Sequence, residues 1–170
     1  MQRALVLAKA AGEQNEVPVG AVLVDARGTI LAEAANATMG HRCAHAHAEL
    51  LALQIATQHP DGAARLDGAT LYCTLEPCLM CFGACMLQRI CRIVYGAVNR
   101  RFGAFSCGAV PLTPSSEDEV ARKDSFPSGE TALRSYNHRI HISGGCMSDE
   151  PVKLLQRFFR AKRTRAGCPA

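Results

Sequence analysis

The sequence predicts one α/β domain whose central sheet is at least partly parallel. Between about residues 17 and 96, β-rich runs and helical runs follow one another, and this order implies crossover connections between strands. Of the 170 residues, 48% are hydrophobic and 20% are charged, which is a normal balance for a chain that buries a core. We therefore interpret residues 1–170 as a single domain.

The first elements are a helix and a hairpin. Residues 1–13 combine apolar positions such as Leu5 and Ala8 with the polar Lys9 and Glu13, which is typical of a surface helix. Residues 17–36 contain two β-rich runs joined around Gly28, whose backbone freedom suits a turn. This segment is therefore predicted to be a β-hairpin.

The next elements alternate between helix and strand. Residues 46–58 carry apolar positions that predict a mostly buried helix, and 69–75 form a short β-rich run. A second helix is predicted over 77–90, with Pro77 in its first turn. Residues 91–96 then predict another buried strand.

The C-terminal third is less regular. Residues 103–136 have few long apolar runs and several prolines, so we expect a long surface excursion with a short helix at 116–123. Residues 139–143 predict a last edge strand. A helix at about 150–163 has Pro151 in its first turn, an acidic start and a basic end, as the helix dipole favours.

Cysteine use and hydropathy indicate the compartment. The chain has nine cysteines, an odd number that argues against a disulfide framework. Reduced cysteines that mostly serve as small core residues fit a cytosolic protein better. No run of about 18 apolar residues lacks a charge, and residues 1–9 lack the features of a signal peptide. We therefore predict a cytoplasmic protein with no membrane partner.

Basic residues crowd the C-terminal end, although the net charge is only +4. A basic end of this kind suits a polyanionic partner, and a solvated helix end explains the charge equally well. Both interpretations stay open on charge alone. The cations concerned are Lys153, Arg157, Arg160, Lys162, Arg163 and Arg165.

Cys78 and Cys81 form a CxxC at the start of a predicted helix, where thiolates are stabilised and can bind zinc. Alone, this motif also fits a redox pair or half of a structural zinc knuckle. His47 offers a third ligand, which leaves the fourth zinc position open for an acidified water. Glu49, two residues further on, is placed to transfer protons. We interpret Cys73 and Cys85 as core residues.

The two motifs together narrow the chemistry. "HAE" at 47–49 with "PCLMC" at 77–81 matches the H-x-E and P-C-x-x-C signature of zinc-dependent nucleobase deaminases. In this pattern His47 is the zinc ligand and Glu49 is the general acid–base catalyst. His45 is then surplus, and it either hydrogen-bonds a neighbour or lines the pocket.

Longer stretches of the sequence resemble the bacterial tRNA-specific adenosine deaminases. These are "EVPVGAVLV", "AHAE", "TLEPCLMC", "RIVYGA", "NHR" and "LLQRFFRAKR", which span nearly the whole chain. The resemblance implies a cytidine deaminase-like three-layer α/β/α sandwich, with a mixed sheet and helices on both faces. It also implies one Zn²⁺ per subunit, a homodimer, and conversion of adenosine to inosine at wobble position 34 of a tRNA anticodon.

The resemblance also implies substrate contacts. Asn36 matches an asparagine that hydrogen-bonds the target base, with a simple turn residue as the alternative. Phe158 and Phe159 match aromatics near the anticodon loop, or they pack the helix. Backbone N–H groups near Ala48 and Cys78 are expected to orient the water or its oxyanion. The basic residues that match phosphate contacts are Arg160, Lys162 and Arg163.

Three positions depart from the family pattern. Cys43-Ala44-His45 replaces Asp-Pro-Thr, Phe82 follows the second cysteine where a small residue is usual, and Asn99 replaces an aspartate near the nucleotide that flanks the target. These changes concern substrate contacts rather than the zinc chemistry. We therefore expect Asn99 to line the substrate site.

Two other functions share these motifs. A free nucleobase or nucleoside deaminase acting on guanine, cytidine or dCMP would use the same zinc site, but the basic aromatic end of the chain favours RNA. A non-catalytic, zinc-stabilised RNA-binding subunit would have no use for Glu49 beside an open position. A purely structural zinc site would need a fourth protein ligand.

Overall fold

A computed structural model of the chain describes residues 1–58, 65–110, 131–135 and 138–165. These residues form four helices and six strands. The helices are α1 (Gln2–Glu13), α2 (Ala48–Gln58), α3 (Leu79–Leu87) and α4 (Asp149–Arg165). The strands are β1 (Gly20–Val24), β2 (Ile30–Ala35), β3 (Thr70–Leu75), β4 (Arg92–Ala97), β5 (Thr131–Ser135) and β6 (His138–Ser143).

The strands form one mixed sheet in the order β2-β1-β3-β4-β6-β5. β1 is antiparallel to both β2 and β3, whereas β3, β4 and β6 run parallel to one another. β5 closes the far edge antiparallel to β6. The parallel strands lie in the interior of the sheet, and β4 is buried from Ile93 to Ala97, as parallel strands usually are. The predicted α/β class with a partly parallel sheet is confirmed.

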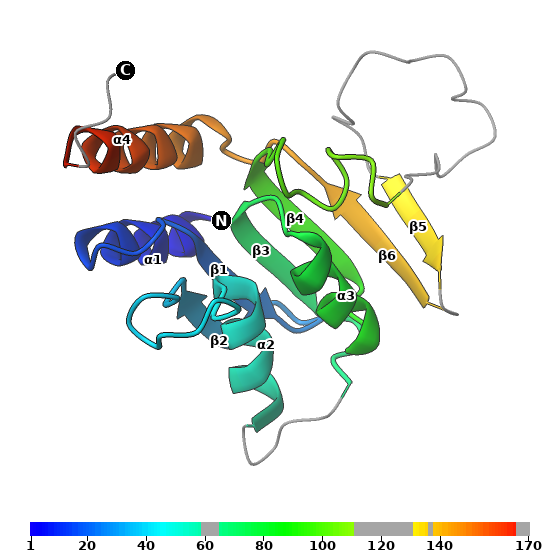
Figure 1. The fold of residues 1–170 in the computed structure, drawn as a ribbon. Coiled ribbons are helices and arrows are strands. Elements are labelled where there is room, and N and C mark those ends of the chain that lie inside the picture. The colour runs from blue at the N-terminus through cyan, green and yellow to red at the C-terminus, as the bar shows by residue number, and fades with distance from the viewer. Residues whose placement is uncertain (59–64, 111–130, 136–137, 166–170) are drawn as a thin grey trace.

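Helices cover both faces of the sheet. α2 and α3 lie together on one face, and α1 and α4 lie together on the other (Figure 1). α1 packs closely on β1 because Gly20 has no side chain: a Cβ there would collide with the backbone of Ala4 and Ala8. The α/β/α sandwich that the resemblance implies is therefore present.

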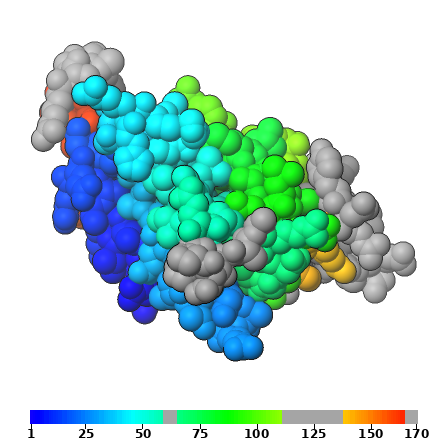
Figure 2. Space-filling model, turned by 90° about the horizontal axis from the view of Figure 1, so that it is seen from below, coloured from blue at the N-terminus to red at the C-terminus, as the bar shows by residue number. Residues whose placement is uncertain are grey.

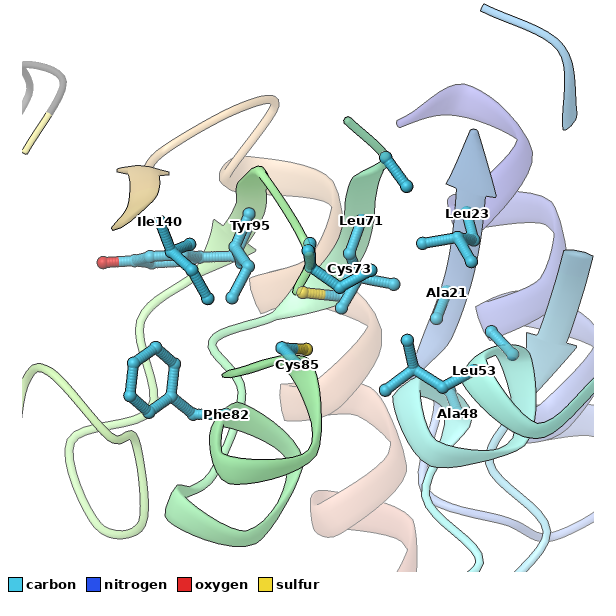
Figure 3. Close-up of a cluster of buried hydrophobic side chains, with 14 of the residues drawn as sticks. Ala21, Leu23, Ala48, Leu53, Leu71, Cys73, Phe82, Cys85, Tyr95 and Ile140 are labelled. Carbon is cyan, nitrogen blue, oxygen red and sulfur yellow. The ribbon is translucent and has the colours of Figure 1, made fainter. Parts of the chain in front are cut away.

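The core between the sheet and the α2–α3 layer is apolar. Cys73 on β3 and Cys85 on α3 are both fully buried there, among side chains from β1, β4 and β6 (Figure 3). Phe82 contacts Phe105 edge-to-face, with ring centroids 5.1 Å apart. Burial of such side chains contributes about 1.5–3 kcal/mol each and holds the helix starts in place. Cys73 and Cys85 act as core residues, as predicted.

The N-terminal half follows the sequence prediction closely. The hairpin forms as β1 and β2, and Gly28 adopts a φ of 86° in its turn. Asp25 organises that turn, because its Oδ1 accepts hydrogen bonds from the backbone N–H of Arg27 and Thr29. One boundary differs: Pro77 lies before the helix, since Cys78 is extended and forms the N-cap of α3.

The C-terminal half differs in two respects. The strand predicted at 139–143 forms as β6, but it lies inside the sheet, and the edge strand is β5. β5 therefore interrupts the segment 103–136 that was predicted to be an irregular excursion. β5 has only five residues and pairs with β6 alone. Its hydrophobic pattern is therefore short, and the polar residues around it in the sequence obscure it. The helix predicted at 116–123 falls outside the described residues.

Two further observations bear on the predicted compartment. Eight cysteines lie among the described residues, and all eight are free thiols. Within the same part of the chain, no helix is both long and apolar enough to cross a membrane.

Candidate metal centre and active site

The predicted zinc ligands meet where two helices begin. His47 immediately precedes α2, Cys78 is the N-cap of α3, and Cys81 lies in the first turn of α3. The His47 Nδ1 atom is 3.6 Å from the Cys78 Sγ atom and 3.4 Å from the Cys81 Sγ atom, and the two sulfurs are 3.6 Å apart. Three potential ligands from separate parts of the chain thus converge on one point.

This geometry fits zinc. In a tetrahedral site, bond lengths of about 2.3 Å to sulfur and 2.0–2.1 Å to nitrogen place two sulfurs roughly 3.8 Å apart and each sulfur about 3.6 Å from the nitrogen. The observed distances of 3.6, 3.6 and 3.4 Å agree to within a few tenths of an ångström. In the described part of the chain this group comprises His47, Cys78 and Cys81, which leaves a tetrahedral position for a non-protein ligand.

The electrostatics of the cluster favour one thiolate, that of Cys78. The pKa of Cys78 falls to about 4, because the Cys81 thiol donates a hydrogen bond to its sulfur and His47 also supports the charge. The pKa of Cys81 is raised, first by donation of that hydrogen bond and then by burial. The hydrogen bond with Cys78 raises the pKa of His47. One thiolate is therefore stabilised already, and a divalent cation would stabilise the second.

Glu49 lies behind this cluster in the first turn of α2. Its side chain is buried, and burial raises the pKa of its carboxyl group above the ordinary range. A carboxyl group whose pKa is raised binds a proton more readily, which suits a group that must accept a proton and pass it on. The structure therefore places an acid–base group beside the metal ligands.

A cavity of about 830 Å³ opens onto the cluster. Its lining contains the predicted zinc ligands His47 and Cys78 together with Glu49. Most of the other lining residues come from two loops, the one after β2 and the one after β4. The other lining residues are Val17, Val19, Asn36, Thr38, Met39, Arg42, Cys43, Ala44, Leu75, Glu76, Asn99 and Phe102.

The loop after β2 is held by the buried carboxylate of Glu16. Its two oxygens accept hydrogen bonds from the backbone N–H groups of Met39 and Gly40, both at 2.7 Å, and from Thr38 Oγ1 at 3.1 Å. Asn36 Nδ2 donates to the same carboxylate at 3.2 Å. Since an ionised carboxylate only accepts, the Asn36 amide nitrogen faces Glu16 and the amide oxygen Oδ1 faces away from it.

The loop after β4 is held by a second buried carboxylate, that of Glu76. It accepts hydrogen bonds from the backbone N–H groups of Asn99, Phe105 and Ser106 at 2.9, 3.0 and 2.7 Å. Asn99 Oδ1 in turn accepts from the backbone N–H of Phe102 at 3.1 Å. Asn99 lines the cavity as predicted, and it also shapes its own loop.

The remaining predicted contacts lie elsewhere. Ala48 is fully buried between the two lining residues His47 and Glu49, at the first residue of α2. The five predicted residues of α4 do not line this cavity. Phe158 and Lys162 border a groove of about 530 Å³ between α1 and α4, and Lys162 lies over the Phe158 ring. The other three, Phe159, Arg160 and Arg163, are exposed on α4.

The departures from the family pattern have clear positions. His45 is exposed, and its ring nitrogens lie 3.2 and 3.4 Å from the Cys43 sulfur, so it contacts a neighbour as one of its two predicted alternatives states. Cys43 lines the cavity, whereas Phe82 is buried in the core. Phe82 therefore affects packing rather than the substrate.

Sequence reasoning missed three residues: Glu16, Glu76 and Phe102. Both glutamates act on backbone groups more than 20 residues away, and no local pattern marks such a contact. A charged residue inside an otherwise apolar run, as in "TLEPC", was the available signal for Glu76, because buried carboxylates require partners.

Comparisons with known proteins agree with this geometry. Residues 1–97 match the family model for the cytidine and deoxycytidylate deaminase zinc-binding region. The chain is 37% identical to the tRNA-specific adenosine deaminase of Agrobacterium fabrum, over 96% of this chain and 93% of that protein. It is 36% identical to the Bacillus subtilis protein of the same name, over 97% and 89% of the two chains.

Solved structures extend the comparison. A tRNA:A34 deaminase studied for A-to-I editing at the wobble position superposes with a TM-score of 0.71 at 35% identity, covering 91% of this chain and 97% of that one. Guanine deaminase from Nitrosomonas europaea superposes with a TM-score of 0.65 at 25% identity, covering 92% and 81% of the two chains. The same fold therefore serves both polynucleotide and free-base substrates.

Proposed function

The chain belongs to the tRNA-specific adenosine deaminases of the cytidine and deoxycytidylate deaminase family, and on that premise we propose that it deaminates adenosine at wobble position 34 of tRNA to inosine. The observation that carries this function is the juxtaposition of the three-ligand cluster with Glu49 at the base of an open cavity. A structural zinc site would use four protein ligands and would have no need of a buried acid–base group beside it.

The chemistry is a hydrolysis at C6 of adenine. His47, Cys78 and Cys81 would hold a zinc ion, which would supply the Lewis acidity that lowers the pKa of water toward neutrality. Glu49 accepts a proton from the attacking water, passes it to the ring nitrogen beside C6, and then delivers the second water proton to the departing amine. One C–O bond forms, one C–N bond breaks, and ammonia leaves.

Chain groups around the cluster hold the base. The Glu16 hydrogen bond turns the Asn36 oxygen away from the carboxylate, where it accepts a hydrogen bond from the purine edge. Backbone N–H groups at Ala48 and Cys78 orient the reacting oxygen. Asn99 lies on the opposite wall, beside the nucleotide that flanks the target. Four α4 side chains contact the anticodon arm: Phe158, Phe159, Arg160 and Arg163.

The test is a substrate panel. Zinc-loaded protein is incubated with a tRNA carrying adenosine at the wobble position, and separately with free adenosine, cytidine, dCMP and guanine; inosine and ammonia are measured. We expect inosine from the tRNA alone. Ammonia from a free base or nucleoside would instead assign a small-molecule deaminase, and inactivity on every substrate would favour a binding subunit.

We also propose a homodimer, formed through the α2–α3 face. Both helices lie on the face seen in Figure 2. Large apolar side chains of both helices are exposed to solvent. The Leu87 side chain is 83% exposed, and Ile55, Leu79 and Met80 are 42–55% exposed. Analytical ultracentrifugation should show a dimer, and Leu87→Arg should shift it toward the monomer.

Two further properties belong to this proposal. The whole chain, 1–170, forms one deaminase domain, which α1 and α4 support by packing on the same sheet as the zinc-binding helices. The enzyme acts in the cytoplasm, where thiols stay reduced, and the eight free cysteines of the described residues support this proposal.

A further inference from the structure

Phe102 is a large apolar side chain left in solvent at the mouth of the active-site cavity. It lines that cavity, yet it is 60% exposed, whereas Phe82 and Phe105 are 5% and 8% exposed in the adjoining core. Its loop is not the part of the chain that was predicted to carry nucleic-acid-binding aromatics. An exposed aromatic ring beside a nucleobase-binding cavity is placed to contact a second base.

The loop that carries Phe102 is fixed tightly to the catalytic cluster. Gly103 pairs with the zinc ligand Cys78 in an isolated β-bridge, and the Ala104 N–H donates to the Pro77 carbonyl at 2.9 Å. A Cβ at residue 103 would collide with the Glu76 carboxylate, so glycine allows this close approach. Phe102 is thus one residue from backbone that is registered to the metal centre.

The surroundings of the ring are basic. The Arg101 guanidinium lies 5.0 Å from the centroid of the Phe102 ring, and Arg42 lines the cavity from the opposite loop. Aromatic rings stack on bases and adjacent cations attract the phosphates that join them, which is the combination found in grooves for single-stranded nucleic acid. These charges favour a polynucleotide over an apolar protein segment as the occupant of this rim.

We infer that Phe102 is a specificity-determining residue that stacks on the base of a nucleotide adjacent to the target adenosine. The inference rests on the proposed function, since it requires a polynucleotide substrate. It explains how a cavity of ordinary size selects a base within a chain: the target enters the cavity, and its neighbour is held outside against the ring. The rigid loop sets the distance between the two bases.

The experiment pairs protein variants with modified RNA. An anticodon stem-loop with adenosine at the wobble position is compared with two versions that carry an abasic nucleotide immediately before or after that adenosine. For each RNA, KM and kcat are measured for the wild type, Phe102→Ala, Phe102→Leu and Phe102→Tyr. Thermal unfolding and sedimentation of each variant report on folding and association.

We expect Phe102→Ala to raise KM on the intact stem-loop roughly 10-fold, within the range of single-base stacking, with kcat nearly unchanged. Phe102→Tyr should restore the affinity, and Phe102→Leu should not. On one of the two abasic RNAs the wild type and Phe102→Ala should have the same KM, which identifies the stacked neighbour. The unfolding temperature should hardly change, because the ring is exposed.

Three results would overturn the inference. An unchanged KM, or an equal loss on all three RNAs, would show that the ring stacks on neither neighbour. A variant that dissociates from dimer to monomer would show that the ring belongs to a subunit contact. If the wild type fails to deaminate the intact stem-loop, the proposed function itself fails, and the inference fails with it.

Discussion

The base of the active site and its rim are built in different ways. At the base, His47, Glu49, Cys78 and Cys81 come from two short motifs, each at the start of one helix. At the rim, two irregular loops are held by single buried carboxylates that reach across the fold. The residues of the base are positioned by short sequence motifs at helix starts, whereas the loops of the rim are positioned by tertiary contacts. In the proposed function, the residues of the base perform the reaction and the residues of the rim determine which substrate binds.

The largest expected effect is at the base of the site. Glu49→Gln keeps the size of the side chain but removes its ability to accept a proton, so deamination should fall by at least about 10²–10⁴-fold. Zinc content, measured by elemental analysis, should stay at one ion per subunit. Asp67→Asn, an exposed carboxylate before β3, is the control and should retain full activity. Normal turnover by Glu49→Gln would remove this residue from the mechanism.

A second test separates ligand from core cysteines. Cys81 and Cys85 are both fully buried on α3, one helical turn apart, but only the first lies in the metal cluster. Cys81→Ala should lose zinc and lower the unfolding temperature by roughly 5–10 °C, because structure and metal binding are coupled. Cys85→Ala should keep its zinc and lose only packing. Equal zinc loss in both variants would contradict the assignment.

The same contrast explains how far the sequence could predict the structure. The hairpin around Gly28, the helix α2 and the cluster of His47 with the CxxC pair depend on short-range patterns, so all three were predictable. The β5 edge strand and the Glu76 contacts depend on residues far along the chain, whose positions no local pattern contains. Phe102 was missed for this reason: its exposure at the cavity follows from where Glu76 holds its loop.

At the rim, Glu76→Gln should act on both stability and substrate. The substituted side chain presents one oxygen in place of two to the three N–H groups of Asn99, Phe105 and Ser106, which leaves a buried donor unpaired at a cost of about 2 kcal/mol. We expect a lower urea midpoint and a higher KM for the stem-loop, at unchanged zinc content. Glu150→Gln, a half-exposed residue of α4, is the control. An unchanged KM would mean that the Asn99 loop does not require its anchor.

The substitution Glu16→Gln should have a smaller effect on the free energy of unfolding, and this effect should depend on pH. Burial alone would raise the pKa of Glu16, but hydrogen bonds from Gly40, Thr38, Met39 and Asn36 together lower it. A carboxylate with a lowered pKa stabilises the fold above its unfolded pKa of about 4.3, and the stabilisation disappears as pH falls through the folded value. Wild type and Glu16→Gln should therefore differ most in unfolding free energy above the unfolded pKa, and the difference should shrink as the pH falls through the lowered pKa of the folded state. If the difference in unfolding free energy between the two proteins stays constant with pH, the ionised form of Glu16 does not stabilise the fold.

The smallest effect is expected furthest from the base, on α4. Arg160 and Arg163 are exposed cations that we place against RNA phosphates, where each contact releases counterions. Arg160→Ala combined with Arg163→Ala should weaken stem-loop binding and reduce the slope of log Kd against log salt concentration by about 1–2, without changing kcat. Arg27→Ala, in the exposed β1–β2 turn, matches the charge removed at one site and should leave the slope unchanged. α4 lies across the sheet from the zinc-binding helices. A change in slope without a change in kcat would therefore show that one helical layer of the sandwich binds the anticodon arm and the other performs the chemistry. An unchanged slope would confine RNA recognition to the rim loops around Asn36 and Phe102.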